Sequence, residues 1–349
     1  MSDCECGYSV NATTSQHMVF TDLIETDWLH IKNASLDTDW QPQEFDVSPQ
    51  NSHGPYGRAA RVANVISNPL NDSHSNSGHS VLGGDPGLQL WVRAKPEGNL
   101  ISTGEIDTMR NDILYGSFRA SMKLTGEPGT CGAFFYYFND TQEIDFEFLS
   151  SQFNATSSPV NLVLHSSLSL QDGNDASHSP TFKVMQLPFR PDEGFHEYRF
   201  DWTPDKVSFY ADGQWLVDMI QDVPTQSGHI AVSQWSNGNE LWSGGPPKSD
   251  AVMTIQYIKA YFNSSHSNRQ ADYARRCSNP SAAKAICVVP ELSGSPTFDT
   301  YFFSENFNQT VNQTVYNDTK KNDAPHPGEG SNRSFWATLV LMAAIIALL

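Results

Sequence analysis

The chain has 349 residues, of which 38% are hydrophobic, 17% charged and 11% aromatic. This composition excludes a disordered chain and allows a large globular core. The formal net charge is -18, from 39 acidic and 21 basic residues, and it excludes nucleic acid as a partner because a phosphate backbone would be repelled. Solubility alone is sufficient to explain the acidity.

Composition divides the chain into four consecutive parts. We expect a polar N-terminal lead-in at residues 1–20, one folded domain at 21–264, a glycosylated linker rich in Asn, Ser, Pro and Thr at 265–334, and a hydrophobic tail at 335–349. The tail is short for a membrane-spanning helix and follows small polar residues, which is typical of a GPI attachment signal; a tail-anchoring helix is the alternative. The first residues lack the pattern of a signal peptide, and we expect the natural start to lie further upstream.

Sequons and cysteines indicate an oxidising, secretory environment. Five cysteines permit at most two intramolecular disulfides, and the short loop between Cys277 and Cys287 favours that pair as one of them. No Cys/His grouping has the spacing of a zinc site. We therefore expect a secreted or cell-surface glycoprotein that contacts the membrane only through a GPI anchor. Ten N-x-S/T sequons begin at Asn11, Asn33, Asn71, Asn139, Asn154, Asn263, Asn308, Asn312, Asn317 and Asn332.

Within the folded domain, short segments that often alternate between apolar and polar residues predict strands. Turn residues separate nearly all of them, and only residues 272–285 suggest a helix, which Pro280 would interrupt. We predict an all-β fold of two packed antiparallel sheets. Asp212-Gly213 predicts a tight hairpin turn. The predicted strands lie in residues 87–94, 115–124, 131–138, 143–150, 160–168, 195–202, 206–220, 229–235 and 253–262.

The segment QEIDFEFLS, residues 142–150, alternates acidic and large apolar side chains. On a strand, Glu143, Asp145 and Glu147 project from one face while the apolar residues between them enter the core. No Lys or Arg occurs between Lys123 and Lys183 to offset the three charges locally. Such crowding raises the pKa of one carboxyl group while another stays ionised.

The spacing of the two glutamates suits a retaining glycosidase. Their Cα atoms would be about 13 Å apart on a strand, and side chains that lean together would bring the carboxyl groups to around 5 Å. One carboxylate would attack the anomeric carbon and the other would protonate the leaving oxygen, with Asp145 between them. From these residues alone, an acidic solvent-exposed face is the alternative.

The surrounding segments make the pattern more specific. EIDFEF stands among YGSFRASMKL, GAFFYYF, HEYRFDWTPDKVSFYADGQW and QWSNGNELWSGGPP, and together these resemble glycoside hydrolase family 16 over residues 40–263. The family includes laminarinases, lichenases and fungal wall transglycosylases. The resemblance implies a concanavalin-type β-jelly roll with a cleft on its concave face. It also implies Glu143 as nucleophile, Asp145 as its assistant and Glu147 as general acid and base.

The chain departs from the family pattern at several positions. Many glucanases of the family read Y-G-x-x-E-x-R, and here Arg119 and Ser121 occupy the Glu and Arg positions. The substrate contacts that the family usually makes near the cleavage point are therefore not expected from these two residues. Gln142 replaces the Asp that often precedes the motif. EIDFEF also lacks the extra residue of laminarinase-type members, which places the chain nearer the lichenase and transglycosylase types.

Aromatic residues are candidates for substrate binding because sugar rings stack on them. Trp235 and Trp242 are candidate platforms, with core or rim packing as the alternative. Phe135 and Tyr137 share one strand face, and Phe134 and Tyr136 share the opposite face. Alternation alone does not say which face meets substrate, and the resemblance favours the face of Phe135 and Tyr137. His165 stands where the family often has a polar contact, and a structural role is equally compatible. Trp202 and Trp215 lie in strand patterns and are expected in the core.

The main hypothesis is a retaining endo-β-glucanase that hydrolyses β-1,3- or β-1,3/1,4-glucan. The alternative within the family is a cell-wall transglycosylase, in which a sugar hydroxyl replaces water. A non-catalytic, lectin-like glycan-binding module is the alternative from another class. We expect a monomer without a cofactor or catalytic metal; a structural calcium ion, which some relatives hold away from the cleft, is the one ion that the resemblance allows.

Overall fold

The computed structural model describes residues 3–10, 18–171, 176–292, 294–296 and 301–306. The chain forms two units, Met1–Thr314 and Val315–Leu349, and all of the described residues belong to the first. The predicted hydrophobic tail and the sequons at Asn11 and beyond residue 307 lie outside the described residues. Among the described residues, no helix is long and apolar enough to cross a membrane.

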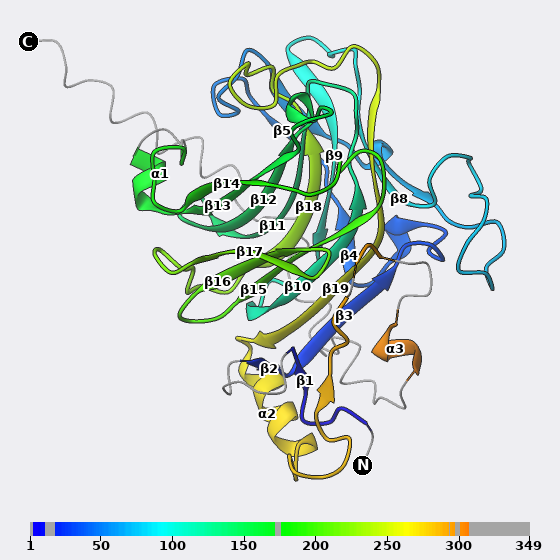
Figure 1. The fold of residues 1–349 in the computed structure, drawn as a ribbon, viewed down its shortest axis with the longest axis vertical. Helices are drawn as coiled ribbons and strands as arrows, with labels where there is room; N and C mark the ends of the chain where they lie inside the picture. Colours follow the sequence, from blue (N-terminus) through cyan, green and yellow to red (C-terminus); the bar gives the residue numbers. More distant parts are fainter. Residues whose placement is uncertain (1–2, 11–17, 172–175, 293, 297–300, 307–349) are drawn as a thin grey trace, which may run out of the picture. The chain divides into compact units, whose positions relative to one another are not determined.

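Two large sheets pack face to face and build the predicted all-β jelly roll (Figure 1). One sheet, which we call the front sheet, has the order β14-β13-β12-β11-β18-β9-β6-β5, with β4 paired to β9. All its pairs are antiparallel except β6 with β9. Its strands are β4 (Trp40–Pro42), β5 (Phe45–Val47), β6 (Gly57–Ala60), β9 (Leu100–Thr108), β11 (Cys131–Asn139), β12 (Gln142–Leu149), β13 (Pro159–His165), β14 (Phe182–Gln186) and β18 (His229–Trp235).

The back sheet has the order β17-β16-β15-β10-β19-β8-β7, with β3 paired to β19, and all its pairs are antiparallel. Its strands are β3 (Asp22–Asp27), β7 (Val65–Asn68), β8 (Gly87–Val92), β10 (Ile113–Lys123), β15 (His196–Trp202), β16 (Val207–Ala211), β17 (Gln214–Met219) and β19 (Ala251–Ser264).

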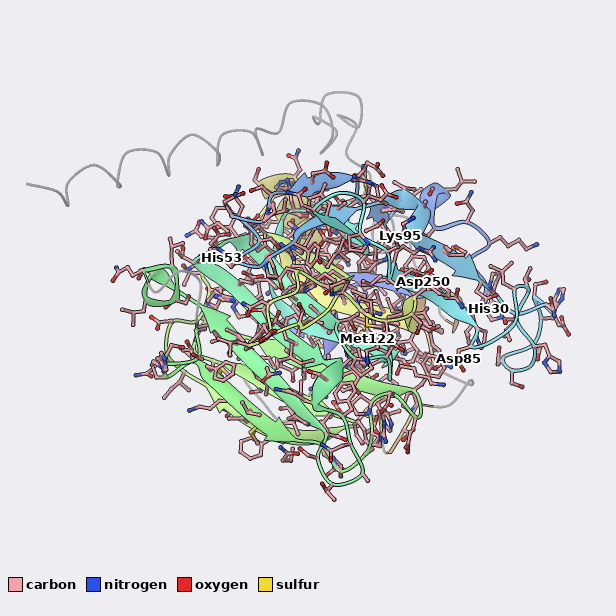
Figure 2. All side chains as sticks on the ribbon, turned by 90° about the horizontal axis from the view of Figure 1, so that it is seen from above. His30, His53, Asp85, Lys95, Met122 and Asp250 are labelled. Carbon is pink, nitrogen blue, oxygen red and sulfur yellow. A yellow bond between two sulfur atoms is a disulfide. The ribbon has the colours of Figure 1, made fainter. Side chains whose placement is uncertain are left out.

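The core between the sheets is built from the apolar face of each strand. Phe146 of β12 lies 5.2 Å from Phe209 of β16, measured between ring centroids, and Phe134 of β11 lies 5.2 Å from Phe200 of β15. These contacts join the front sheet to the back sheet. Met122 of β10, labelled in Figure 2, is fully buried in the same cluster. Complete burial of one such side chain contributes about 1.5 to 3 kcal/mol.

The predicted hairpin at Asp212-Gly213 is confirmed. Both residues have positive φ, 47° and 74°, as a tight turn between β16 and β17 requires. The backbone oxygen of Leu292 would lie 2.2 Å from a Cβ atom on Gly213, so the position has no room for a side chain.

The two tryptophans expected in the core have different surroundings. Trp202 is fully buried, and its indole N–H donates to the backbone oxygen of Pro224 at 2.9 Å. Trp215 is 60% exposed, so the prediction that it is buried is wrong. The pairing of β16 with β17 shifts register between Phe209 and Tyr210, and Trp215 therefore faces solvent opposite Tyr210.

A third, three-stranded sheet joins the two ends of the described chain. It contains β1 (Tyr8–Ser9), β2 (Val19–Phe20) and β20 (Cys287–Val288), and β1, β2 and α2 (Ser267–Arg276) lie together in Figure 1. Short helices α1 (Ser167–Gln171) and α3 (Phe303–Asn306) complete the fold. Residues 3–10 and 265–292, expected in a lead-in and a linker, are therefore part of the folded unit, because their apolar side chains pack on β3 and β19.

The disulfide bonds are Cys4–Cys287 and Cys6–Cys277, and Cys131 is a buried free thiol. The predicted pairing of Cys277 with Cys287 is wrong. The pairing of β1 with β20 places Tyr8 beside Cys287 and so brings the N-terminal cysteines to the C-terminal ones. This pairing depends on contacts between opposite ends of the chain. The length of the loop between Cys277 and Cys287, on which the prediction was based, gives no information on such contacts.

Candidate active site

The three carboxylates of β12 lie on the face of the front sheet that does not pack against the back sheet. Ile144, Phe146 and Phe148 are buried in the core, as the alternation predicted. Glu143 and Glu147 are partly exposed and Asp145 is buried. The neighbouring strands carry the side chains that surround them, so we describe this face of β12 and its neighbours as the carboxylate face.

Burial and mutual repulsion determine the protonation of the three groups. Burial raises the pKa of Glu147 to about 7. Burial, followed by the charges of Glu143 and Glu147, raises the pKa of Asp145 well above its usual range. Burial also raises the pKa of Glu143, and a hydrogen bond with Asp145 opposes this shift because it stabilises the charged form. The pKa of Glu143 is about 8 despite this hydrogen bond. Asp145 therefore keeps its proton and donates to Glu143, whereas Glu143 and Glu147 both titrate near neutral pH.

His165 of β13 stands opposite Glu143 in the register, and its Nε2 atom lies 3.7 Å from Asp145 Oδ2. Burial lowers the pKa of His165 to about 4, so the ring is neutral near pH 7. Its Nδ1 atom lies 3.2 Å from the Ser169 hydroxyl, which itself donates to the backbone oxygen of Ser166. Ser169 therefore accepts from His165, which leaves Nε2 as the acceptor nitrogen facing Asp145.

Two side chains hold the carboxylate of Glu147. The Trp242 indole N–H donates to it, and the Trp242 ring centroid lies 6.1 Å from that of Phe182. The Cys131 thiol lies 3.6 Å from Glu147 Oε1 and donates to it. Trp242, which we expected to stack against sugar rings, therefore lies beside Glu147, the candidate general acid. Cys131 and Phe182 were missed by the sequence reasoning, because neither belongs to a recognisable catalytic pattern.

The structure resolves which aromatic pair of β11 meets the carboxylates. Phe134 and Tyr136 are buried in the core, whereas Phe135 stands opposite Asp145 and Tyr137 opposite Glu143. The Tyr137 hydroxyl donates to Asp140 at 2.8 Å. Phe135 and Tyr137 therefore belong to the carboxylate face.

Trp235 ends β18 opposite Cys131. The guanidinium carbon of Arg58 lies 4.9 Å from the centroid of its ring. Arg58 brings a positive charge to the carboxylate face from β6, far away in the sequence. It was missed because a single arginine in a strand carries no pattern that marks its partner.

Arg119 and Ser121, where the chain departs from the family pattern, do not lie on the carboxylate face. Both residues lie on β10 of the back sheet, where Phe118, Ala120 and Met122 face the core and the alternate residues face away from it. Arg119 is 2% exposed and donates to the backbone oxygen of Pro290 at 3.0 Å. Arg119 thus contacts the C-terminal segment, and the Ser121 hydroxyl donates to the Gln256 side chain of β19 at 3.0 Å.

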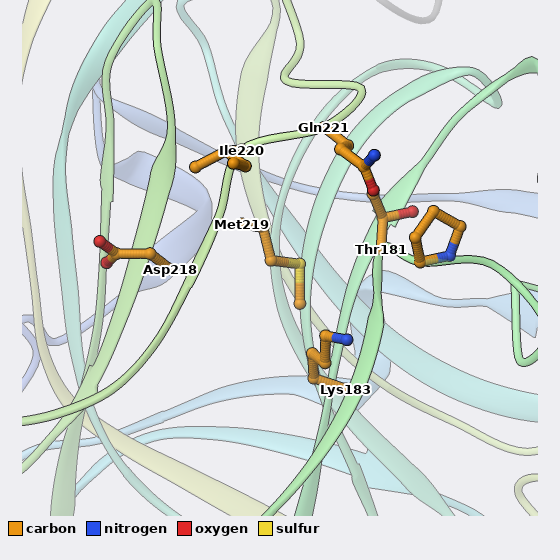
Figure 3. A pocket seen from close by; sticks show the side chains of 7 residues that line it. Thr181, Lys183, Asp218, Met219, Ile220 and Gln221 are labelled. Carbon is orange, nitrogen blue, oxygen red and sulfur yellow. The ribbon is translucent and has the colours of Figure 1, made fainter.

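Ligand atoms of Glu143, Asp145 and His165 lie within 4.8 Å of one another, a separation that a metal ion could bridge. The hydrogen bond between the carboxyl groups of Glu143 and Asp145 accounts for the approach of these two side chains. A separate hollow of about 180 Å³ lies between β14 and the end of β17 (Figure 3). Its lining, which includes Lys183, Asp218 and Ile220, contains none of the candidate site residues.

Comparisons with known proteins agree with this architecture. A β-glucanase of Acetivibrio thermocellus is 29% identical over 161 residues, which span 43% of this chain and 43% of that protein. A Crh-like protein of Candida albicans is 25% identical over 162 residues, 41% of this chain and 32% of that protein. The chain thus spans less than half the length of these relatives.

Solved structures share the fold. The β-glucanase of Bacillus licheniformis superposes with a TM-score of 0.50 at 20% identity, covering 68% of this chain and 97% of that one. A laminarinase from Flavobacterium sp. UMI-01 gives a TM-score of 0.50 at 19% identity, covering 68% and 98%. The sequence profile described as Glycosyl hydrolases family 16 matches residues 71–259, more than half of the chain. The chain belongs to glycosyl hydrolases family 16.

Proposed function

We propose that this protein is a retaining glycosidase that cleaves β-1,3- or mixed β-1,3/1,4-glucan inside the polymer, with Glu143, Asp145 and Glu147 as its catalytic residues. The observation that carries the proposal is the protonation pattern of these three groups on one strand face. Burial raises the pKa of Glu147 to about 7 and that of Glu143 to about 8, and Asp145, which keeps its proton, opposes the shift at Glu143 by a hydrogen bond that favours the ionised form.

In the first step, the Glu143 carboxylate attacks the anomeric carbon and forms an ester bond, while Glu147 gives its proton to the departing glycosidic oxygen. Asp145 holds its proton towards Glu143 and thereby orients the attacking oxygen. In the second step, the Glu147 carboxylate takes a proton from an incoming water molecule, whose oxygen attacks the anomeric carbon and releases Glu143. Trp242 and Cys131, which both donate to Glu147, stabilise its ionised form between the two steps.

A sugar hydroxyl can replace water in the second step, and the product is then a longer glycan. The similarity to a Crh-like protein as well as to β-glucanases supports transglycosylation as the second candidate. A lectin-like module has less support, since all three carboxylates are present and Asp145 is hydrogen-bonded to Glu143.

The decisive experiment is mass spectrometry of products from laminarin, lichenan and chitin oligosaccharides, each with and without a labelled acceptor. Shorter unlabelled products alone indicate hydrolysis, and labelled products longer than the acceptor indicate transfer. Glu143→Gln and Glu147→Gln should each lower kcat by at least about a thousandfold. Glu97→Gln, at an exposed turn before β9, is the matched control. Full activity of the Glu143→Gln variant would refute the assignment.

We also propose that the protein is secreted and anchored at the cell surface through GPI. Two disulfide bonds support an oxidising compartment, and the sequon residues Asn33, Asn71 and Asn154 are exposed to solvent. Release of the native membrane-bound protein by a phosphatidylinositol-specific phospholipase tests the anchor. Protein that stays on the membrane after this treatment would contradict it.

A further inference from the structure

Arg58 lies on the carboxylate face but has no role in the proposed catalytic steps. Its Nε atom is buried, and no hydrogen bond reaches it within the part of the chain that the structure describes. No carboxylate of the described residues lies within 4.0 Å of its guanidinium nitrogens. Arg61, three residues further on, is the contrast: it forms an ion pair of 2.7 Å with Asp46 and donates to the backbone oxygen of Ala60.

The position of Arg58 over Trp235 is built by the backbone around it. The Tyr56 N–H donates to the backbone oxygen of Asn237 at 3.0 Å, and the Asn239 side chain donates to the backbone oxygen of His53 (labelled in Figure 2) at 3.2 Å. A Cβ atom on Gly54 would lie 2.3 Å from the Asn237 oxygen, so only glycine allows this approach. The loop after β18 and the segment before β6 are therefore held together, and this fixes Arg58 relative to Trp235.

Trp235, over which the guanidinium lies, stands opposite Cys131 in the register, and the Cys131 thiol donates to Glu147, so Arg58 lies on the same face as the carboxylates. Burial raises the pKa of both Glu143 and Glu147, and the positive charge of Arg58 opposes the shift at each of them. A guanidinium presents five N–H donors in a rigid plane, and donors left without acceptors favour a ligand that supplies oxygen atoms. The hydroxyl groups of a sugar are such acceptors, whereas a uronate or sulfate would be repelled by the neighbouring carboxylates.

We propose that Arg58 and Trp235 form a glycan subsite, in which the Arg58 guanidinium donates hydrogen bonds to hydroxyl oxygens of a neutral β-glucan bound beside the carboxylates. This inference rests on the proposed function, since it names the substrate contact of the same site. Arg58 covers one face of the Trp235 indole, so the pair acts together: the ring orients the guanidinium, and the guanidinium binds the sugar.

The test compares Arg58→Gln and Arg58→Lys with Arg61→Gln, a matched control that removes a cation from the same segment. KM and kcat are measured on the soluble β-glucan oligosaccharide that the wild type cleaves best. The Kd for that oligosaccharide is measured by calorimetry in the Glu143→Gln background. We expect Arg58→Gln to raise KM and Kd about tenfold to a hundredfold while kcat changes less than about threefold. Arg58→Lys should recover part of the loss, because it keeps the charge but not the planar donors.

An Arg58→Gln variant with the KM and Kd of the Arg61→Gln control would overturn the subsite. A lower kcat with a displaced pH profile and an unchanged Kd would also overturn it, since Arg58 would then act only on the carboxylates. Thermal midpoints of all variants separate these outcomes from unfolding. The proposed function fails separately, if Glu143→Gln keeps full activity or if no β-glucan is cleaved or bound.

Discussion

The two disulfide bonds should stabilise the protein in a strongly non-additive way. Cys4–Cys287 joins residues separated by 283 positions, and Cys6–Cys277 joins residues separated by 271. Either bridge alone closes almost the whole folded unit into one loop. Once one is closed, the other closes only a small ring, made of the short segments 4–6 and 277–287.

The chain-entropy relation gives the magnitudes. Closing the long loop stabilises the native state by about 5 to 6 kcal/mol, whereas closing a ring of about a dozen residues adds about 3 kcal/mol. Removal of either bridge leaves the other to close the long loop, so it should lower the free energy of unfolding by only about 3 kcal/mol. Removal of both should lower it by about 8 kcal/mol, well above twice the single effect.

Urea unfolding of three serine variants measures this coupling: Cys4/Cys287, Cys6/Cys277 and the variant with all four replaced. The carboxylate face lies on the front sheet, whereas the bridges join segments that pack on β3 and β19 of the back sheet, so activity at low temperature should persist in each variant that folds. A loss of about 5 kcal/mol from one bridge alone would refute the reasoning. So would a loss for the quadruple variant that equals the sum of the two single losses.

Three further predictions concern Glu147 and two side chains of the two sheets, Phe146 and Trp215. Burial raises the pKa of Glu147 to about 7, so kcat/KM should fall above that pH as the acid loses its proton, and a pH profile that stays level to pH 9 would contradict this role. Because this pKa exceeds the unfolded value of about 4.5, the stabilising contribution of Glu147 is complete below pH 4.5 and lost as pH rises to 7; the urea midpoint should therefore fall over this range in the wild type and fall less in Glu147→Gln. Phe146→Ala should cost about 3 to 5 kcal/mol, and Trp215→Ala, at a side chain that is 60% exposed, less than about 1 kcal/mol; similar urea midpoints for the two variants would contradict the burial assignment.

Local periodicity was sufficient to predict which residues of β12 face the core. Two-residue alternation depends only on the strand backbone, so Ile144, Phe146 and Phe148 could be separated from the three carboxylates without knowledge of the fold. The hairpin at Asp212-Gly213 was predictable for a similar reason, because the positive φ angles of the turn are a local preference.

Features that depend on pairing between distant segments were not predictable. Alternation could not decide between the two faces of β11, and the register of Phe135 with Asp145 resolves it. The same reason explains why Trp215 was placed in the core, since a register shift with β16 turns it outward. The disulfide pairing and the position of Arg58 depend on contacts that no local pattern encodes.

The two faces of β12 explain how one strand can carry three acidic groups. Ionisation of each buried carboxyl group disfavours the folded state, and a shared proton between Glu143 and Asp145 reduces the number of charges that the face must hold. The opposite face places Phe146 and Phe148 in a fully apolar core, whose burial offsets the remaining cost. Because alternate residues face the proposed active site and the core, a substitution on one face can be made without altering the packing of the other. The burial that makes ionisation of Glu147 costly is also what raises its pKa to about 7, the range that the proposed general acid requires.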